Sequence, residues 1–156
     1  MNPKTRMSTP ALLAAVRESS LLASVPTRLL INGHWRTALT GKTFDVEDPA
    51  TGEVLASVAD AGAEDGAAAW DAAVAAQESW RTCRRANAVR FLRRAFEPVT
   101  ERAEDFALLM TLEWANRLAE ARGEVTYGAE FPRWFSEDAV RALGPIGVPG
   151  WEVALA

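Results

Sequence analysis

The stretch TFDVEDPATGEVLASVA, residues 43–59, decides how the chain begins to fold. Two β-prone runs, 43–47 and 53–59, flank the turn sequence DPATGE, and such a turn between such runs is typical of a hairpin. A second turn, at 40–42, separates this hairpin from an earlier β-prone segment, 29–36. The pair Asn32-Gly33 inside that segment resembles a type I′ turn, but the other two turns have the stronger support. The sequence therefore predicts three strand segments in a small antiparallel β-unit.

On both sides of this β-unit the apolar period becomes helical. A short helix is expected from Thr9, as N-cap with Pro10 just inside, to about residue 23. An Ala-rich helix follows over 63–80, with an acidic first turn, and one broken helix or two consecutive helices follow over about 89–113. The last helix is expected over 118–143, ended by Gly144-Pro145. Its predicted apolar face consists of Leu118, Ala121, Val125, Gly128, Phe131 and Phe135.

Composition limits the protein to one globular core of 156 residues, 49% of them hydrophobic, 24% charged, with a net charge of −4. The negative balance makes nucleic acid an unsuitable partner. One cysteine, Cys83, and one histidine, His34, cannot supply a closed zinc site. The longest apolar-rich stretch, 67–76, falls far short of the roughly 20 residues of a membrane span. Without a recognisable signal peptide, the expected location is the cytoplasm.

Cys83 lies among arginines, which favour a reactive thiolate. A nucleophile also needs a base, and nothing in the sequence brings His34 near it, so catalysis by Cys83 is not the favoured interpretation. The only basic cluster could bind phosphate, but a solvated helix face whose arginines pair with the following acids is the preferred reading. It consists of Arg81, Arg84, Arg85, Arg90, Arg93 and Arg94, and the acids are Glu97, Glu101, Glu104 and Asp105.

Aromatic stripes and glycine-rich loops can each form a binding site. Six tryptophans could form a ligand-binding stripe, although core or interface packing is the commoner role: they are Trp35, Trp70, Trp80, Trp114, Trp134 and Trp151. Neither of the glycine-rich phosphate-binding patterns G-x-G-x-x-G and G-x-x-x-x-G-K-[ST] occurs in the chain. No nucleotide site can therefore be read from the sequence.

Several motifs, in order and at matching spacing, resemble the start of aldehyde dehydrogenases: LINGHW at 30–35, TFDV at 43–46 and DPATGEVL at 48–55. Later strings look most like the succinate-semialdehyde dehydrogenase branch: LRRAF at 92–96, TERAED at 100–105, LAEARGEV at 118–125 and YGAEF at 127–131. The match spans about residues 29–141. The resemblance implies an α/β family fold, present here as a mostly helical N-terminal fragment with a small antiparallel β-unit.

The same resemblance implies a reaction, the NAD(P)-dependent oxidation of an aldehyde to an acid. In the family a cysteine attacks the carbonyl, hydride passes to the coenzyme, and a glutamate helps to hydrolyse the thioester. That cysteine, the glutamate, the oxyanion-holding asparagine and the coenzyme loop all correspond to positions after this region, and Cys83 does not match the nucleophile. Some members hold a structural cation near the positions of Glu113 and Val46. The expected sets of catalytic, coenzyme-binding and metal-binding residues in this chain are therefore empty.

The chain also departs from the family pattern. The family's helix end E-x-G-K-P is Glu113-Trp114-Ala115-Asn116-Arg117 here, without the glycine and proline. Pro98 and Pro132 stand where the helical pattern continues, and an interior proline costs about 3 kcal/mol. The family's helices pack on the coenzyme domain, so side chains such as Phe131 and Phe135 are expected to be uncovered.

The sequence thus predicts an extension with a short helix (1–28), the N-terminal part of an aldehyde dehydrogenase-like domain (29–143) and an unmatched tail (144–156). A truncated succinate-semialdehyde dehydrogenase-like protein, inactive alone, is the expected function, with NAD or NADP bound only by complete relatives. The alternative is a non-catalytic module that docks on a full-length dehydrogenase subunit. Homo- or hetero-association through uncovered apolar helix faces is the expected mode of partnership.

Overall fold

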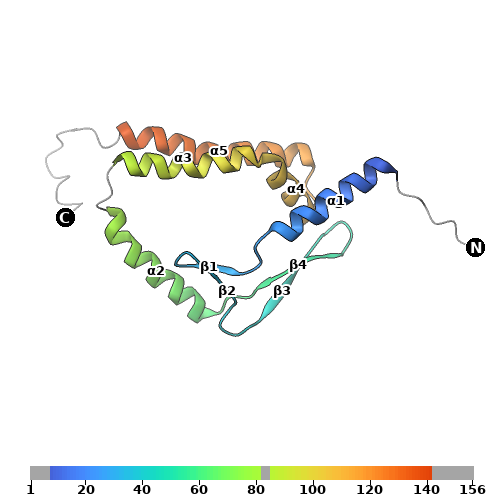
Figure 1. Ribbon diagram of the computed structural model, residues 1–156, viewed down its shortest axis with the longest axis horizontal. Coiled ribbons are helices and arrows are strands. Elements are labelled where there is room, and N and C mark those ends of the chain that lie inside the picture. The colour runs from blue at the N-terminus through green and yellow to red at the C-terminus, as the bar shows by residue number, and fades with distance from the viewer. Residues whose placement is uncertain (1–7, 82–84, 142–156) are drawn as a thin grey trace, which may run out of the picture.

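The computed structural model describes residues 8–81 and 85–141. These residues form five helices and two separate two-stranded antiparallel sheets. In Figure 1, α2 leads from the hairpins to the start of α3, while α3 and α5 lie side by side. The expected mostly helical fragment with a small antiparallel β-unit is confirmed. None of the helices in the described part of the chain is long and apolar enough to cross a membrane.

The first hairpin corrects one expectation. Residues 29–36, predicted as a single strand segment, form β1 (Leu29–Ile31) and β2 (His34–Arg36), with Ile31 opposite His34. Asn32 and Gly33 between them have φ values of 52° and 75°. A type I′ turn needs positive φ at both positions, which asparagine tolerates and glycine favours. Asn32 and Gly33 therefore form the turn that their sequence resembles.

The second hairpin confirms its prediction. β3 (Thr43–Glu47) pairs with β4 (Val54–Ala59), with an irregularity between Val46 and Glu47. In the turn, the Gly52 N–H donates to the Asp48 carbonyl at 2.7 Å. The Asp48 carboxylate accepts from the Ala50 N–H at 2.8 Å, an Asx turn that stabilises the reversal.

A buried carboxylate joins the first hairpin to α2 (Ala63–Arg81). Asp65 is 1% exposed, and its Oδ1 accepts a 2.8 Å hydrogen bond from the Arg36 guanidinium. Its carboxylate also accepts from the backbone N–H groups of Leu39 and Gly62, at 3.2 Å each for Oδ2. The bond to Gly62 satisfies an otherwise free donor at the start of α2, in the manner of a capping box.

Three of the remaining helices form the main packed unit. α3 (Arg85–Glu101) and α4 (Ala103–Trp114) both pack on α5 (Leu118–Arg141), so the expected break in the middle helix is confirmed. The centre consists of Ala107, Ala121 and Val125. The predicted apolar face of α3 is half-buried, and it consists of Val89, Leu92, Phe96 and Val99.

Helix ends and interiors differ from expectation at single residues. α1 (Thr9–Ser24) has Ser8 as its N-cap position, one residue before the predicted Thr9, because the Ser8 carbonyl already accepts from the Leu12 N–H at 3.0 Å. α4 ends although the family's glycine is absent, since Ala115 adopts the left-handed conformation, with φ 52° and ψ 26°. α3 and α5 continue through Pro98 and Pro132.

Part of the predicted organisation lies outside the described residues. This applies to the stop at Gly144-Pro145, to the tail 144–156 and to the boundary after 143. The boundary after 28 stays a prediction.

Candidate functional site

Four aromatic side chains lie exposed along one side of α5. They are Tyr127, Phe131, Trp134 and Phe135, which are 70%, 48%, 58% and 53% exposed. Together with Glu130 they line a shallow depression of about 400 Å³. The Tyr127 and Phe131 rings meet edge to face, with centroids 5.1 Å apart. We call these four residues the α5 aromatic face.

The position of this face corrects the predicted stripe of α5. Phe131 and Phe135 were expected beside Leu118, Ala121 and Val125, but the buried positions continue through Ala129 and Ser136 instead. A helix turns by about 100° per residue, so Ala129, four positions after Val125, lies on nearly the same side of α5. Phe131, six positions after Val125, lies on a different side. The expected exposure of Phe131 and Phe135 is found in the structure.

An arginine is fixed between two carboxylates beside the α5 aromatic face. Arg133 donates to Glu130 through Nε at 2.7 Å and to Glu137 through Nη1 at 2.9 Å. These hydrogen bonds to Glu130 lower the pKa of its carboxyl, and Glu130 raises the pKa of Arg133. The charges next to the aromatic rings therefore satisfy one another, which leaves the rings available for apolar contact.

A second uncovered apolar surface lies on α2. Trp70, Val74 and Trp80 line a depression of about 610 Å³ together with Gln77 and small side chains of the same helix. Trp70 is 72% exposed. Beyond Asp65, α2 has few tertiary contacts; the Trp80 ring meets Phe91 of α3 edge to face, at 5.3 Å between centroids. We call Trp70, Val74 and Trp80 the α2 apolar face.

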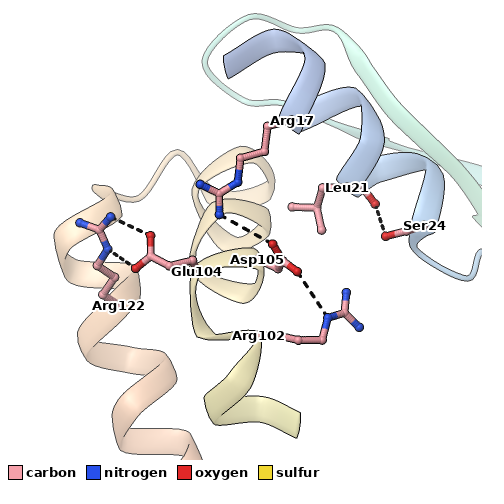
Figure 2. A network of polar contacts seen from close by, with 7 residues as sticks. All are labelled: Arg17, Leu21, Ser24, Arg102, Glu104, Asp105 and Arg122. Atoms are coloured by element: carbon pink, nitrogen blue, oxygen red, sulfur yellow. Dashed lines mark hydrogen bonds and ion pairs between the residues drawn. The ribbon is translucent and has the colours of Figure 1, made fainter. Parts of the chain in front are cut away.

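Polar contacts position α1, α4 and α5 relative to one another (Figure 2). Arg122 of α5 makes a two-pronged contact with Glu104 of α4, with Nε and Nη2 at 2.7 and 2.8 Å from its two oxygens. This pairing lowers the pKa of Glu104 and raises that of Arg122. Asp105 of α4 lies 3.7 Å from Arg17 of α1 and 3.4 Å from Arg102. α4 is thus tied to both neighbours.

The basic cluster does not pair as expected. Glu104 binds Arg122 and Asp105 binds Arg17 and Arg102, so these two acids do not pair with the arginines of α3. In the part of the chain that the structure describes, no ion pair involves Arg93, Arg94 or Glu97. The predicted contacts of Arg93 and Arg94 with Glu97 are therefore wrong. The side chains of Arg81, Arg84 and Arg85 lie outside the description.

The structure brings no catalytic group together within its described ranges. His34 lies exposed on β2, and Cys83 falls between the two described ranges, as Trp151 falls after them. Within residues 8–81 and 85–141, no group of three or more acidic, histidine or cysteine side chains could hold a metal ion. Val46 lies on β3 and Glu113 is exposed near the end of α4.

The hydrogen bonds by which Asp65 links α2 to the first hairpin were not predicted from the sequence. The position of Asp65 three residues after Gly62 is the spacing of a capping box, so this half of its role was visible. Its other partners, Arg36 and Leu39, lie 29 and 26 residues away and are set only by the tertiary fold.

Comparison with known proteins places these features in a family. Residues 35–151 match the aldehyde dehydrogenase family. The succinate-semialdehyde dehydrogenase of Paenarthrobacter nicotinovorans is 63% identical over 92 residues, which cover 58% of this chain and 20% of that protein. The succinate-semialdehyde dehydrogenase [NADP(+)] of Escherichia coli K12 is 43% identical over 121 residues, 78% of this chain and 25% of that protein.

A solved structure of an aldehyde dehydrogenase is also similar to this chain. Betaine aldehyde dehydrogenase from Staphylococcus aureus, in complex with NAD+, superposes with a TM-score of 0.75 at 25% identity, over 78% of this chain and 25% of that one. The chain thus spans a fifth to a quarter of the length of these three relatives. The match over residues 35–151 covers most of the sequence, and we conclude that the chain belongs to the aldehyde dehydrogenase family.

Proposed function

We propose that this chain acts as the N-terminal segment of a succinate-semialdehyde dehydrogenase-like enzyme, and that the α2 apolar face and the α5 aromatic face bind the remaining part of such an enzyme. The observation that carries this proposal is the exposure of Trp70 on α2 and of Trp134 on α5, 72% and 58%. Side chains of this size are normally buried by a partner surface. The 63% identity over 92 residues to a succinate-semialdehyde dehydrogenase supports the branch.

The reaction of the completed enzyme would be the NAD(P)-dependent oxidation of succinate semialdehyde to the acid. Support for the coenzyme comes from relatives, one named for NADP(+) and one solved with NAD+. In this proposal the 156-residue polypeptide by itself does not oxidise aldehydes. Its role is structural, because the described residues provide docking faces and a fixed helical frame. For its location we propose the cytoplasm, which cell fractionation would check.

A second candidate is a non-catalytic module that docks on a complete dehydrogenase subunit. The same two apolar faces favour it, since a surface complementary to the dehydrogenase fold could also bind an intact subunit. The two candidates differ in one result. The segment hypothesis needs a partner whose own N-terminal quarter is missing, whereas the module binds a partner that retains it.

Complementation tests both. The purified 156-residue chain is mixed with a succinate-semialdehyde dehydrogenase from which the matching N-terminal region has been deleted, and NAD(P)H formation from succinate semialdehyde is followed. We expect no turnover by either piece alone and measurable turnover after mixing. Turnover by the chain alone would refute the inactivity, and binding only to the intact enzyme would favour the docking module.

Matched variants make the result specific. Phe131→Ser with Trp134→Ser removes apolar area from the α5 aromatic face, and both positions are about half exposed, so folding should be retained. This variant should lose complementation. Exposed Phe44 on β3, 53% exposed, serves as control, and Phe44→Ser should complement normally. Equal loss in both variants would show that the α5 aromatic face is not the contact.

A further inference from the structure

The exposed side of α3 carries an ordered arrangement of charge. Arg90 and Arg94 precede Glu97 and Glu101 along the helix, and all four side chains are exposed. Their spacings of four, three and four residues place them along one face of the helix. The opposite face, which includes Leu92 and Phe96, packs toward α5. The charged face is therefore positive at its start, negative at its end and directed away from the packed unit.

These four charges are not neutralised within the described chain, where no ion pair includes any of them. Pairing along the helix gains little, because an arginine that precedes its glutamate has the weaker orientation on a helix. By contrast, Glu104 of α4 and Arg122 of α5 pair with each other. The α3 charges are thus available to another molecule.

We propose that this face of α3 binds a second copy of the chain, with the two α3 helices antiparallel about a two-fold axis near residues 95–96. In that arrangement Arg90 and Arg94 of one copy lie beside Glu101 and Glu97 of the other, and symmetry makes each contact twice. A parallel arrangement would oppose like charges. Charge complementarity therefore selects both the occupant and its direction.

An apolar strip on α3 lies next to the four charged residues, and its burial would add stability that surface ion pairs do not provide. Phe91 is 60% exposed, and Ala95 and Pro98 are exposed at the following positions of the same strip. The antiparallel arrangement brings Phe91 of one copy to Pro98 of the other. Burial of this aromatic ring stabilises the dimer, while the surrounding charges fix register and specificity. The chain's net charge of −4 disfavours a polyanion as the occupant of the same face.

Sedimentation of the full chain at two ionic strengths tests the dimer. The Debye length is about 30 Å at 0.01 M and about 3 Å at 1 M. We expect dimers at the low value that dissociate at the high value. A monomer at both ionic strengths, at concentrations up to about 100 μM, would overturn the proposal, because the dissociation constant would then lie above the range of a specific contact. Association that strengthens with salt would assign self-contact to an apolar surface instead and would overturn it too.

Charge-exchange variants locate the contact. Arg90→Glu with Arg94→Glu, and separately Glu97→Arg with Glu101→Arg, should each raise the dissociation constant about tenfold or more, since attraction becomes repulsion at every pair. An equimolar mixture of the two variants should form a heterodimer. The variant with all four exchanges restores complementarity and should dimerise like the natural chain, which keeps the test valid if one double variant folds poorly.

The matched control changes net charge by the same amount elsewhere. Arg28 and Arg117 are exposed and lie outside α3, so Arg28→Glu with Arg117→Glu should leave the dissociation constant within about twofold at equal ionic strength. If this control dissociates the dimer as strongly as the α3 variants, net charge rather than the α3 face governs association. Failure of the mixture and of the fourfold exchange to dimerise would likewise exclude the antiparallel contact.

Discussion

The guanidinium of Arg36 on β2 lies 2.8 Å from the buried carboxylate of Asp65 on α2, although 29 residues separate the two in the sequence. Asp65 is 1% exposed and the Arg36 side chain 35% exposed. The same carboxylate accepts backbone hydrogen bonds from Leu39 and Gly62. One acidic side chain therefore sets the direction in which α2 leaves the first hairpin.

We expect Asp65→Ala to destabilise the chain by about 2–4 kcal/mol. Removal of one member of a buried pair leaves an uncompensated charge and costs about 3–5 kcal/mol, and the partial exposure of Arg36 reduces this. Urea unfolding monitored by circular dichroism measures the change. Glu64, exposed in the same turn, is the control, and Glu64→Ala should change stability by no more than about 0.5 kcal/mol. Equal effects at both positions would contradict the role of Asp65.

Ala115→Gly should stabilise the chain by about 0.5–1 kcal/mol. Ala115 is held at φ 52° at the end of α4, where a Cβ atom costs about 1–2 kcal/mol and glycine fits without strain, less the greater chain entropy of glycine when unfolded. The same exchange at exposed Ala95 within α3 should destabilise by about 1 kcal/mol. Opposite signs at the two sites, measured by denaturant unfolding, are the decisive result; loss of stability at both would argue against strain at Ala115.

Pro132→Ala should stabilise α5 by about 1–3 kcal/mol. Pro132 offers no N–H group to the carbonyl of Gly128 within a helix that continues on both sides. Pro98 lies close to the end of α3, where fewer helical bonds depend on it. Pro98→Ala is therefore expected to give the smaller gain in thermal unfolding temperature. A lower unfolding temperature for Pro132→Ala would mean that packing of α5 requires the bend that a proline imposes.

We expect the stability of the folded chain to decrease as the pH is lowered through the acidic range, in part because of Glu104. Arg122 lowers the pKa of this carboxyl in the folded state, so its contribution is complete above the unfolded-state pKa and disappears as the pH falls through the lower, folded-state pKa. Carboxyl titration by NMR should give a midpoint below the ordinary glutamate range. Arg122→Gln should return it to that range, whereas Arg117→Gln should not. High salt should weaken the shift, because both side chains are about half exposed.

Features set by neighbouring residues could be predicted from the sequence. The hairpin over 43–59 follows from its turn residues, and Val89, Leu92, Phe96 and Val99 lie on the packed face of α3 as their spacing indicates. The predicted N-cap, Thr9, differs by one residue from the observed one, Ser8, since both residue types are suitable caps.

Features set by tertiary contacts could not be predicted from the sequence. The α5 stripe was extended to Phe131 and Phe135 because large apolar residues outweighed Ala129 and Ser136, which the packing buries instead. Small residues allow close approach of helices but carry little hydrophobic signal. The pairing of Glu104 with Arg122, 18 residues away, likewise displaced the expected contacts with α3, because the choice of partner depends on how α4 and α5 meet.

The alanine-rich centre formed by Ala107, Ala121 and Val125 has a calorimetric consequence. The heat capacity change of unfolding rises with the apolar area newly exposed to water, and large apolar rings such as those of Trp70 and Trp114 are already hydrated when the chain is folded. The free chain should accordingly show a low, broad endotherm and a stability curve that is nearly flat with temperature. Docking of the remaining enzyme would sharpen that endotherm into a cooperative peak.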